Sequence, residues 1–275
     1  MSQRAKILVF DSGLGGLTVF VEVAKLRPTA DYLYCADDAA FPYGAWGEPE
    51  LVARILEVMA GLVAREAPDL VVVACNTAST LALPALRARW QNLPFVGTVP
   101  AIKPAALLSQ SKMISVLATP GTVARDYTQK LIDDFAADCA VTLVGSKHLA
   151  RYAERAMHGG DVADADILAE ISPCFIANGR ARTDAIALAC THYPLLLERF
   201  QRLAPWETQW IDPAPAIARR AGQVLGEAPG QNVAGLPSGR RRIEFTSGKA
   251  PSPSLVSVLA RFGFEAADCL TNSDT

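Results

Sequence analysis

The sequence predicts an α/β protein in which mainly parallel sheets carry helices on both faces. Short apolar, β-branched segments alternate with helical patterns along the chain, which is typical of parallel sheets. Hydrophobic residues make up 51% of the 275 residues and charged residues 20%, so the chain can bury a large core. Aromatic residues are only 7%. The abundance of Ala, Val and Leu therefore favours helices packed closely on sheets over a β-sandwich.

The predicted strands are short runs of apolar residues, and one helix between them has a clear amphipathic pattern. Leu51, Ile55, Val58, Leu62 and Val63 recur at helical spacing, which predicts a helix over residues 50–66. The segments that read as buried strands are residues 6–10, 32–35, 70–75, 114–118, 141–144 and 186–190, with a late strand at 242–246.

A weak internal repeat predicts two similar lobes. Residues 7–13 and 114–121 each lead from a strand into a Gly-containing turn, and residues 70–77 are echoed by 185–192. Pro-containing crossings near residues 97–104 and 206–215 mark the changes of lobe. We therefore expect a first lobe from residues 1–98 and 210–275 and a second from 99–209. The Gly- and Pro-rich stretch 226–239 is expected to be a surface loop.

Composition argues against several classes of partner. The formal net charge of −2 does not provide the concentrated positive surface of a nucleic-acid-binding protein. The one basic run, residues 240–242, reads as a solvated loop end. The N-terminus lacks a signal-peptide pattern, and no apolar run reaches the ~20 residues that span a bilayer. We expect a cytoplasmic protein that needs neither membrane nor nucleic acid.

Two of the six cysteines occupy matching positions. Cys75 and Cys190 each end a predicted strand, where open α/β sheets bind ligands, and polar residues that can begin a helix follow each. A helix N-terminus suits a carboxylate ligand and lowers the pKa of a thiol. The spacing of the cysteines matches neither a disulfide framework nor a metal site. The other four, Cys35, Cys139, Cys174 and Cys269, lack such a counterpart and are expected to be ordinary buried residues.

A pair of facing thiols suits racemisation. The reaction removes the α-proton from one face of a carbon and returns a proton to the other, so it needs one group as thiolate and one as thiol. A single strand-end cysteine is more often simply buried. The match between Cys75 and Cys190 favours the chemical interpretation for this pair.

Other strand-end residues are candidates for binding. The turn at residues 11–18 lacks the Gly-x-Gly-x-x-Gly pattern of nucleotide sites, because Thr18 stands at the last glycine position. Asp11 and Ser12 either meet the ammonium and carboxylate of a ligand or cap the next helix, two alternatives of equal weight here. Asp37 and the loop that contains Pro42, Tyr43 and Gly44 follow the second strand.

These motifs together resemble those of the bacterial glutamate racemases. The resemblance rests on VFDSGLGGLT (9–18), PYG (42–44), ACNTAS (74–79), VPAIKP (99–104), LATPGT (117–122) and CTHYPLL (190–196). It implies two α/β lobes related by a pseudo-twofold axis, with the active site between them. It further implies catalysis without any cofactor or metal, L- and D-glutamate as the substrate, and a role in peptidoglycan synthesis. Members of the family often form dimers, so a homodimer is a possible assembly.

The resemblance also implies individual roles. Cys75 would deprotonate D-glutamate and Cys190 L-glutamate, assisted by Asp11 and His192 respectively. The remaining matches are polar or substrate-holding positions: Ser12, Asp37, Pro42, Tyr43, Gly44, Asn76, Thr77 and Thr191. Glu154 lies in a stretch, residues 144–159, that resembles one branch of the family only. Ala189 departs from the pattern, since the family has glycine before its second cysteine.

Three other functions are compatible with parts of the pattern. Aspartate racemase shares the two-cysteine logic, and only loop geometry would separate the substrates. A cysteine hydrolase with Cys75 as nucleophile and His192 as base would leave Cys190 without a role. A non-catalytic binding protein would be expected to have lost one of the cysteines.

Overall fold

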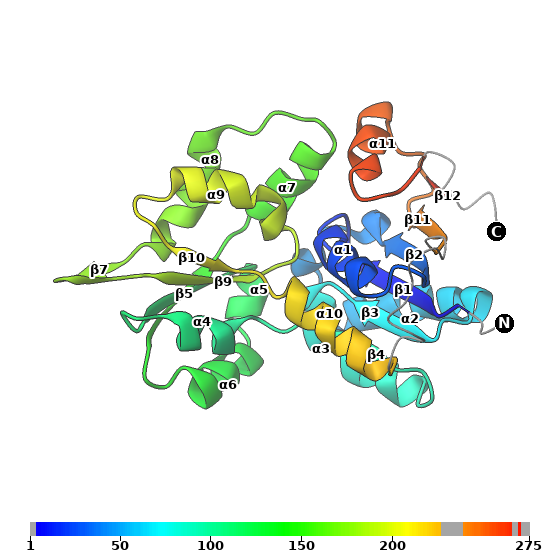
Figure 1. Cartoon of the computed structure of the whole chain (residues 1–275), viewed down its shortest axis with the longest axis horizontal. Helices are drawn as coiled ribbons and strands as arrows, with labels where there is room; N and C mark the ends of the chain where they lie inside the picture. Colours follow the sequence, from blue (N-terminus) through cyan, green and yellow to red (C-terminus); the bar gives the residue numbers. More distant parts are fainter. Residues whose placement is uncertain (1–3, 227–238, 266–268, 271–275) are drawn as a thin grey trace. The chain divides into compact units, whose positions relative to one another are not determined.

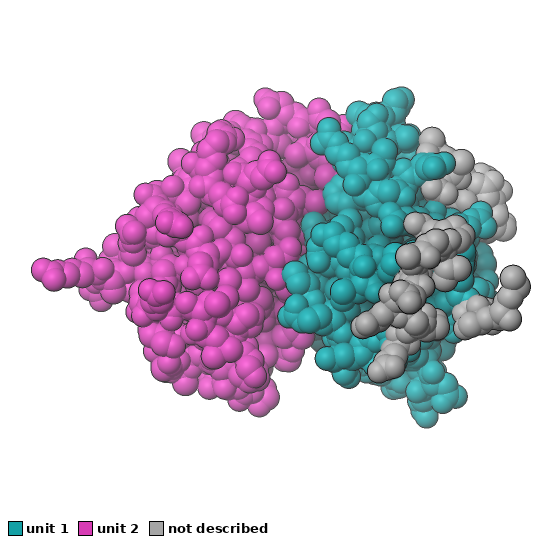
Figure 2. Space-filling view, viewed as in Figure 1, with its two compact units in different colours: residues 1–98, 214–275 teal, residues 99–213 magenta. Residues whose placement is uncertain are grey.

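The computed structural model describes residues 4–226, 239–265 and 269–270, and most of its α-helices and strands are labelled in Figure 1. The chain forms two compact units, Met1–Thr98 with Ala214–Thr275, and Val99–Pro213 (Figure 2). The expected return to the first lobe at residue 210 differs from the structure. Residues 209–211 instead form a strand of the second unit's sheet. Residues 227–238, most of the expected loop 226–239, lie outside the described part of the chain.

The first unit contains a parallel sheet with the strand order β12-β11-β2-β1-β3-β4. Its strands are β1 (Lys6–Asp11), β2 (Asp31–Ala36), β3 (Leu70–Val73), β4 (Phe95–Gly97), β11 (Arg241–Phe245) and β12 (Cys269–Leu270). Strand β3 ends before Cys75, which the sequence placed within it, because Cys75 is already the N-cap of the next helix. Arg241 and Arg242 lie in β11, so the basic run is not a solvated loop end.

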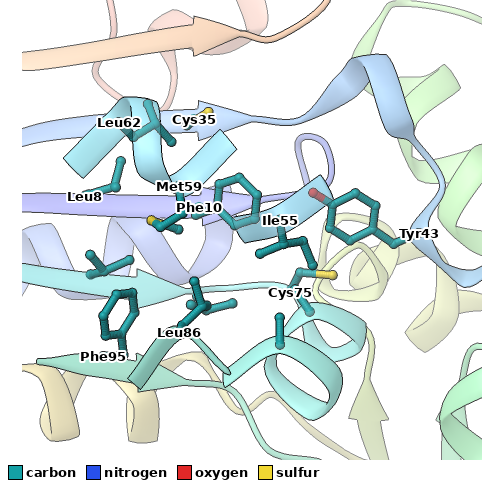
Figure 3. Close-up of a cluster of buried hydrophobic side chains, with 14 of the residues drawn as sticks. Leu8, Phe10, Cys35, Tyr43, Ile55, Met59, Leu62, Cys75, Leu86 and Phe95 are labelled. Carbon is teal, nitrogen blue, oxygen red and sulfur yellow. The ribbon is translucent and has the colours of Figure 1, made fainter. Parts of the chain in front are cut away.

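Helices cover both faces of this sheet. The helical elements are α1 (Leu17–Leu26), η1 (Asp38–Ala40), η2 (Tyr43–Ala45), α2 (Glu48–Glu66), α3 (Asn76–Arg89), α10 (Ala214–Val224) and α11 (Pro253–Ala260). The predicted stripe of α2 packs with α3 on one face, where Ile55, Phe10 and Leu86 belong to one buried cluster (Figure 3). On the other face α1 packs with α10, and Phe20 of α1 stacks on Phe264 at 4.8 Å.

The second unit contains a parallel sheet with the order β10-β9-β5-β6. Its strands are β5 (Met113–Ala118), β6 (Ala140–Gly145), β9 (Ala185–Ala189) and β10 (Gln209–Ile211), beside an antiparallel ribbon of β7 (Ala177–Asn178) and β8 (Ala181–Arg182) that the sequence did not predict. Its helical elements are α4 (Ile102–Leu108), α5 (Pro120–Val123), α6 (Asp126–Phe135), α7 (Leu149–Met157), α8 (Asp164–Ile171), η3 (Ser172–Cys174), η4 (Tyr193–Leu196) and α9 (Leu197–Leu203). Helices α7, α8 and α9 share a core on one face, and α4 and α6 on the other.

The two units share a strand order. In the first, β1 lies between β2 and β3, and β4 follows β3; in the second, β5 lies between β6 and β9, and β10 follows β9. The predicted α/β fold with parallel sheets flanked by helices is therefore confirmed. The repeat places Cys75 after β3 and Cys190 after β9, which are equivalent strands. No helix in the described ranges is long and apolar enough to cross a membrane.

Candidate active site

The first half-site is the group of residues at the carboxyl ends of β1, β2 and β3: Asp11, Ser12, Asp37, Pro42, Tyr43, Gly44, Cys75, Asn76 and Thr77. Asp11 is the last residue of β1, Asp37 follows β2, and Cys75 lies just beyond β3. Because these neighbouring strands are parallel, their carboxyl ends meet at one edge of the sheet. The fold therefore gathers side chains that are far apart in the sequence.

Cys75 is linked to a carboxylate through one hydroxyl. Its thiol lies 3.8 Å from Ser12 Oγ, at a distance that suits a weak S–H donor. The Ser12 hydroxyl lies 3.4 Å from Asp11 Oδ1, which also accepts a hydrogen bond of 2.8 Å from the Gly13 main chain. The alternative that Asp11 or Ser12 caps the next helix is wrong, since α1 has Gly16 as its N-cap and no side-chain cap. Asp11 is fully buried.

Cys75 also stands at the N-terminus of α3. Its carbonyl accepts the first helical hydrogen bond, from Ser79 N at 2.8 Å, so Cys75 lies at the end of α3 where the first N–H groups have no partner within the helix. The next residue, Asn76, is 3% exposed, and neither its amide nitrogen nor its amide oxygen has a hydrogen-bond partner among the described residues. A buried primary amide without partners is costly in a folded protein. This amide is therefore available to a polar ligand.

Asp37 and the loop after it form a connected structure. The Tyr43 hydroxyl donates to Asp37 Oδ2 at 2.6 Å, and the tyrosine ring is buried near Phe10. Pro42 follows a cis peptide bond, and Gly44 lies in η2 with an exposed surface. Figure 3 shows Tyr43 and Cys75 at the same end of the buried cluster. Burial, together with the nearby negative charge of Asp37, raises the pKa of Tyr43, so its hydroxyl remains a donor.

The second half-site consists of Cys190, Thr191, His192 and Glu154. Cys190 follows β9 directly, and its sulfur lies 4.0 Å from His192 Nδ1. His192 Nε2 lies 2.8 Å from Oε1 of Glu154, a residue of α7. An ionised carboxylate only accepts hydrogen bonds, so Nε2 is the ring nitrogen that donates to Glu154, and Nδ1 is the one that faces the thiol. The segment after Cys190 begins with the 3-10 helix η4, which contains Pro194, and α9 follows it.

The remaining cysteines differ from this pair. Cys75 and Cys190 are each 7% exposed, whereas Cys35 and Cys174 are 0% exposed. Burial raises the pKa of Cys174 to about 12 and that of Cys35 well above its ordinary value. Cys139 is only half-buried, contrary to the expectation of full burial, and burial with the adjacent Asp138 raises its pKa. The side chain of Cys269 lies outside the described part of the chain.

Two residues that contact Asp37 were not singled out from the sequence. Arg54 of α2 and Thr246, which follows β11, both donate hydrogen bonds to its carboxylate. Arg54 has a sequence signal, since it is a charged residue at the border of the apolar stripe of α2. Within the described residues, no three His, Cys, Asp or Glu side chains are grouped so that they could hold a metal ion.

The fold and the paired cysteines define a class of protein: an α/β protein of two units with the same strand order, each carrying one thiol at the carboxyl end of an equivalent strand. Comparison with known proteins names the class. The family model described as Asp/Glu/Hydantoin racemase matches residues 19–221.

Individual relatives agree with this match. The glutamate racemase of Agrobacterium fabrum is 53% identical over 243 residues, 88% of each chain. That of Mesorhizobium japonicum is 54% identical over 244 residues, 88% of this chain and 92% of the relative. The crystal structure of Escherichia coli glutamate racemase with L-glutamate and the activator UDP-MurNAc-Ala has a TM-score of 0.84 and 39% identity, covering 96% of this chain and 97% of that one. The chain therefore belongs to the Asp/Glu/hydantoin racemase family and is an amino-acid racemase.

Proposed function

We propose that this protein interconverts L- and D-glutamate, with Cys75 and Cys190 as the two acid/base groups. One observation carries the proposal: each cysteine follows an equivalent strand and is linked to a carboxylate by one bridging side chain. Ser12 bridges Cys75 to Asp11, and His192 bridges Cys190 to Glu154. Glutamate is the proposed substrate because the relatives that cover most of this chain are glutamate racemases.

The proposed reaction requires both half-sites to act on one bound glutamate. In the L-to-D direction, the Cys190 thiolate takes the α-proton and becomes a thiol, leaving the electron pair on the α-carbon and its carboxylate. The Cys75 thiol then gives its proton to the opposite face and becomes a thiolate. The product is D-glutamate, and the two sulfurs have exchanged protonation states. The D-to-L direction is the same sequence in reverse.

The bridging side chains have defined roles in this scheme. His192, held by Glu154, can accept the Cys190 proton and so generate the thiolate. On the other side, the Ser12 hydroxyl, which donates to Asp11, accepts from the Cys75 thiol and holds it in place, and the N-terminus of α3 stabilises negative charge on the sulfur. Asp11 orients Ser12 and offers a negative charge to the substrate ammonium group.

Binding of glutamate is assigned to the polar groups around the thiols. The Asn76 amide, which lacks a hydrogen-bond partner within the described part of the chain, supports this assignment, since it offers both a donor and an acceptor to a ligand with two carboxylates and one ammonium. Ser12, Thr77 and Thr191 add hydroxyl groups, and the turn of Pro42, Tyr43 and Gly44 adds main-chain N–H groups. We further propose that the enzyme supplies D-glutamate for peptidoglycan in the cytoplasm of a bacterium, as its similarity to bacterial glutamate racemases suggests. The homodimer remains a prediction.

Solvent-proton exchange at the α-carbon tests the proposal. L- and D-glutamate are each incubated with enzyme in deuterated water without added cofactor, and deuterium in substrate and product is followed by NMR. Wild type is compared with Cys75→Ala, Cys190→Ala and the control Cys139→Ala, which removes a half-buried thiol outside both half-sites.

We expect deuterium in the inverted product of wild type and Cys139→Ala, and no racemisation by either of the other two variants. Normal racemisation by Cys75→Ala or Cys190→Ala would refute the two-thiol mechanism. Exchange with aspartate but not with glutamate would refute the assigned substrate and leave the mechanism standing.

A further inference from the structure

Asp37 is a buried carboxylate whose two oxygens both accept hydrogen bonds from protein side chains. Oδ1 accepts from Arg54 Nη2 and from Thr246 Oγ1, each at 2.6 Å. Oδ2 accepts from the Tyr43 hydroxyl at 2.6 Å and from Arg54 Nε at 3.2 Å. A carboxylate has about four acceptor positions. The protein donors therefore occupy the acceptor positions of Asp37 that a substrate ammonium group would otherwise use.

Arg54 compensates the charge of Asp37. The Asp37 side chain is 0% exposed and that of Arg54 is 28% exposed, so the carboxylate alone is removed from water. A buried carboxylate without a partner is strongly unfavourable, and an arginine that contacts both oxygens satisfies it in charge and in geometry. Arg54 thus offsets the charge of the buried Asp37 carboxylate next to the tyrosine hydroxyl.

The Tyr43 end of this network reaches the substrate loop. The phenol is fixed by Asp37 at its hydroxyl and by Phe10 at its ring, 6.5 Å between centroids. Tyr43 is the first residue of η2, so its position sets the position of the main-chain N–H groups of residues 43 and 44. A second tie, from Trp46 Nε1 to the Ala40 carbonyl at 2.8 Å, holds the other side of the same loop. Fixing the phenol therefore fixes the loop backbone.

We propose that Arg54 is a positioning residue of the first half-site, which acts through Asp37 to hold Tyr43 and the 41–45 loop in the geometry that binds glutamate. This inference rests on the proposed function. Arg54 itself contacts no reacting atom in this scheme. Loss of Arg54 loosens a binding loop, so the enzyme binds the substrate ground state and the transition state more weakly by the same amount. Such uniform loss raises KM and leaves kcat nearly unchanged.

A double-mutant cycle separates this role from general stability. Arg54→Gln, Asp37→Asn and the double variant are compared for KM, kcat and unfolding midpoint, with Arg54→Lys as the conservative variant. Arg65→Gln is the matched control. Arg65 also lies in α2, is 35% exposed, and pairs with Glu244 of β11 at 2.5 Å, away from Asp37.

We expect Arg54→Gln to raise the KM for glutamate about tenfold and to change kcat by less than about threefold. The KM of Arg54→Lys should lie between those of wild type and Arg54→Gln, because lysine keeps the positive charge but cannot make the bidentate contact with the carboxylate. In the Asp37→Asn background, Arg54→Gln should raise the KM for glutamate by less than about twofold, since Arg54 acts through Asp37 and that carboxylate is already gone.

Equal KM values for Arg54→Gln and Arg65→Gln would overturn the inference, as would additive effects of the Arg54 and Asp37 substitutions. If Arg54→Gln does not fold, the same cycle is read with Arg54→Lys, and additivity there overturns it too. The proposed function is judged separately. It fails if wild type and Arg65→Gln do not racemise glutamate, whereas the inference alone fails if they do and the cycle is additive.

Discussion

His192 and Glu154 form a hydrogen-bonded pair across the second unit, with Nε2 of the imidazole 2.8 Å from Oε1 of the carboxylate. The pair joins a residue that follows β9 to a residue of α7. It has no chemical equivalent in the first half-site, where a hydroxyl, Ser12, stands between Cys75 and Asp11. In the proposed mechanism the two thiols therefore have different assistants, an imidazole paired with a carboxylate for Cys190 and a hydroxyl for Cys75. The half-reactions can consequently be perturbed one at a time.

Glu154→Gln should slow the step that uses Cys190. Glutamine still accepts a hydrogen bond but no longer stabilises a protonated His192, so we expect kcat/KM to fall about 10- to 100-fold. Since the enantiomers have equal free energy, the fall must be the same in both directions. The primary deuterium isotope effect distinguishes the steps. The isotope effect should rise with α-deuterated L-glutamate and fall with α-deuterated D-glutamate. The opposite pattern would contradict the proposed role, because it would show that Glu154 assists Cys75.

Ser12→Ala should slow the other step, the one that uses Cys75. Removing the hydroxyl breaks the link from Cys75 to Asp11, so the isotope effect should rise with α-deuterated D-glutamate and kcat/KM should fall about 10- to 100-fold. Thr18→Ala is the matched control. Thr18 lies near the same turn, and its hydroxyl donates to the Gly15 carbonyl. A similar loss of activity in both variants would show that the turn, and not the thiol link, is responsible.

Gly16→Ala should disturb the first half-site by crowding. A Cβ at residue 16 would lie 2.8 Å from the Ala74 Cβ and 2.9 Å from the Asp11 Cβ, closer than packed carbons approach. We expect a loss of about 1–3 kcal/mol in unfolding free energy and a reduced kcat/KM. Gly61→Ala is the control, because nothing lies within 4 Å of its added Cβ in α2. It should stabilise the protein by about 0.5–1 kcal/mol, measured by urea unfolding. Equal unfolding midpoints for the two variants would contradict the packing argument.

Asp184→Asn should destabilise the second unit in a pH-dependent way. Burial raises the pKa of Asp184, but hydrogen bonds from Ser109, Ser111 and Gln110 outweigh it, and the net pKa is lowered. A lowered pKa in the folded state gives stability that is present above the unfolded pKa of about 3.9 and is lost as the pH falls through the folded value. We expect Asp184→Asn to lower the free energy of unfolding by about 1 kcal/mol at pH 7. The loss is smaller than for a fully buried charge, because Asp184 is partly solvated.

Urea unfolding of wild type and Asp184→Asn from pH 7 down to pH 3 measures this effect. The difference between the two proteins should shrink below about pH 4. Asp161→Asn, at an exposed position, should give a small difference at every pH. A difference for Asp184→Asn that stays constant across this range would show that the ionised form contributes nothing.

Local patterns in the sequence were enough to predict seven strands and the two cysteine turns, but not the sheet strands β4, β10 and β12. The helix predicted over residues 50–66 is found as α2, Glu48–Glu66, because its apolar residues repeat with the helical period. The apolar runs before Cys75 and Cys190 predicted β3 and β9, and strand ends of a parallel sheet are where polar loops gather. These features depend on residues that are close in the sequence, so a single sequence contains them.

The partners of the site residues depend on the tertiary structure. Cys75 meets Ser12 over 63 residues of sequence, His192 meets Glu154 over 38, and Asp37 meets Thr246 over 209. The sequence left Asp11 and Ser12 between capping and binding, and it expected Asp37 to be a substrate-site residue without indicating that Arg54 would neutralise it. Hydrophobic periodicity specifies which face of an element is buried, but not which element lies beside it. The strand order and register decide that, and with them the hydrogen bonds that surround each thiol.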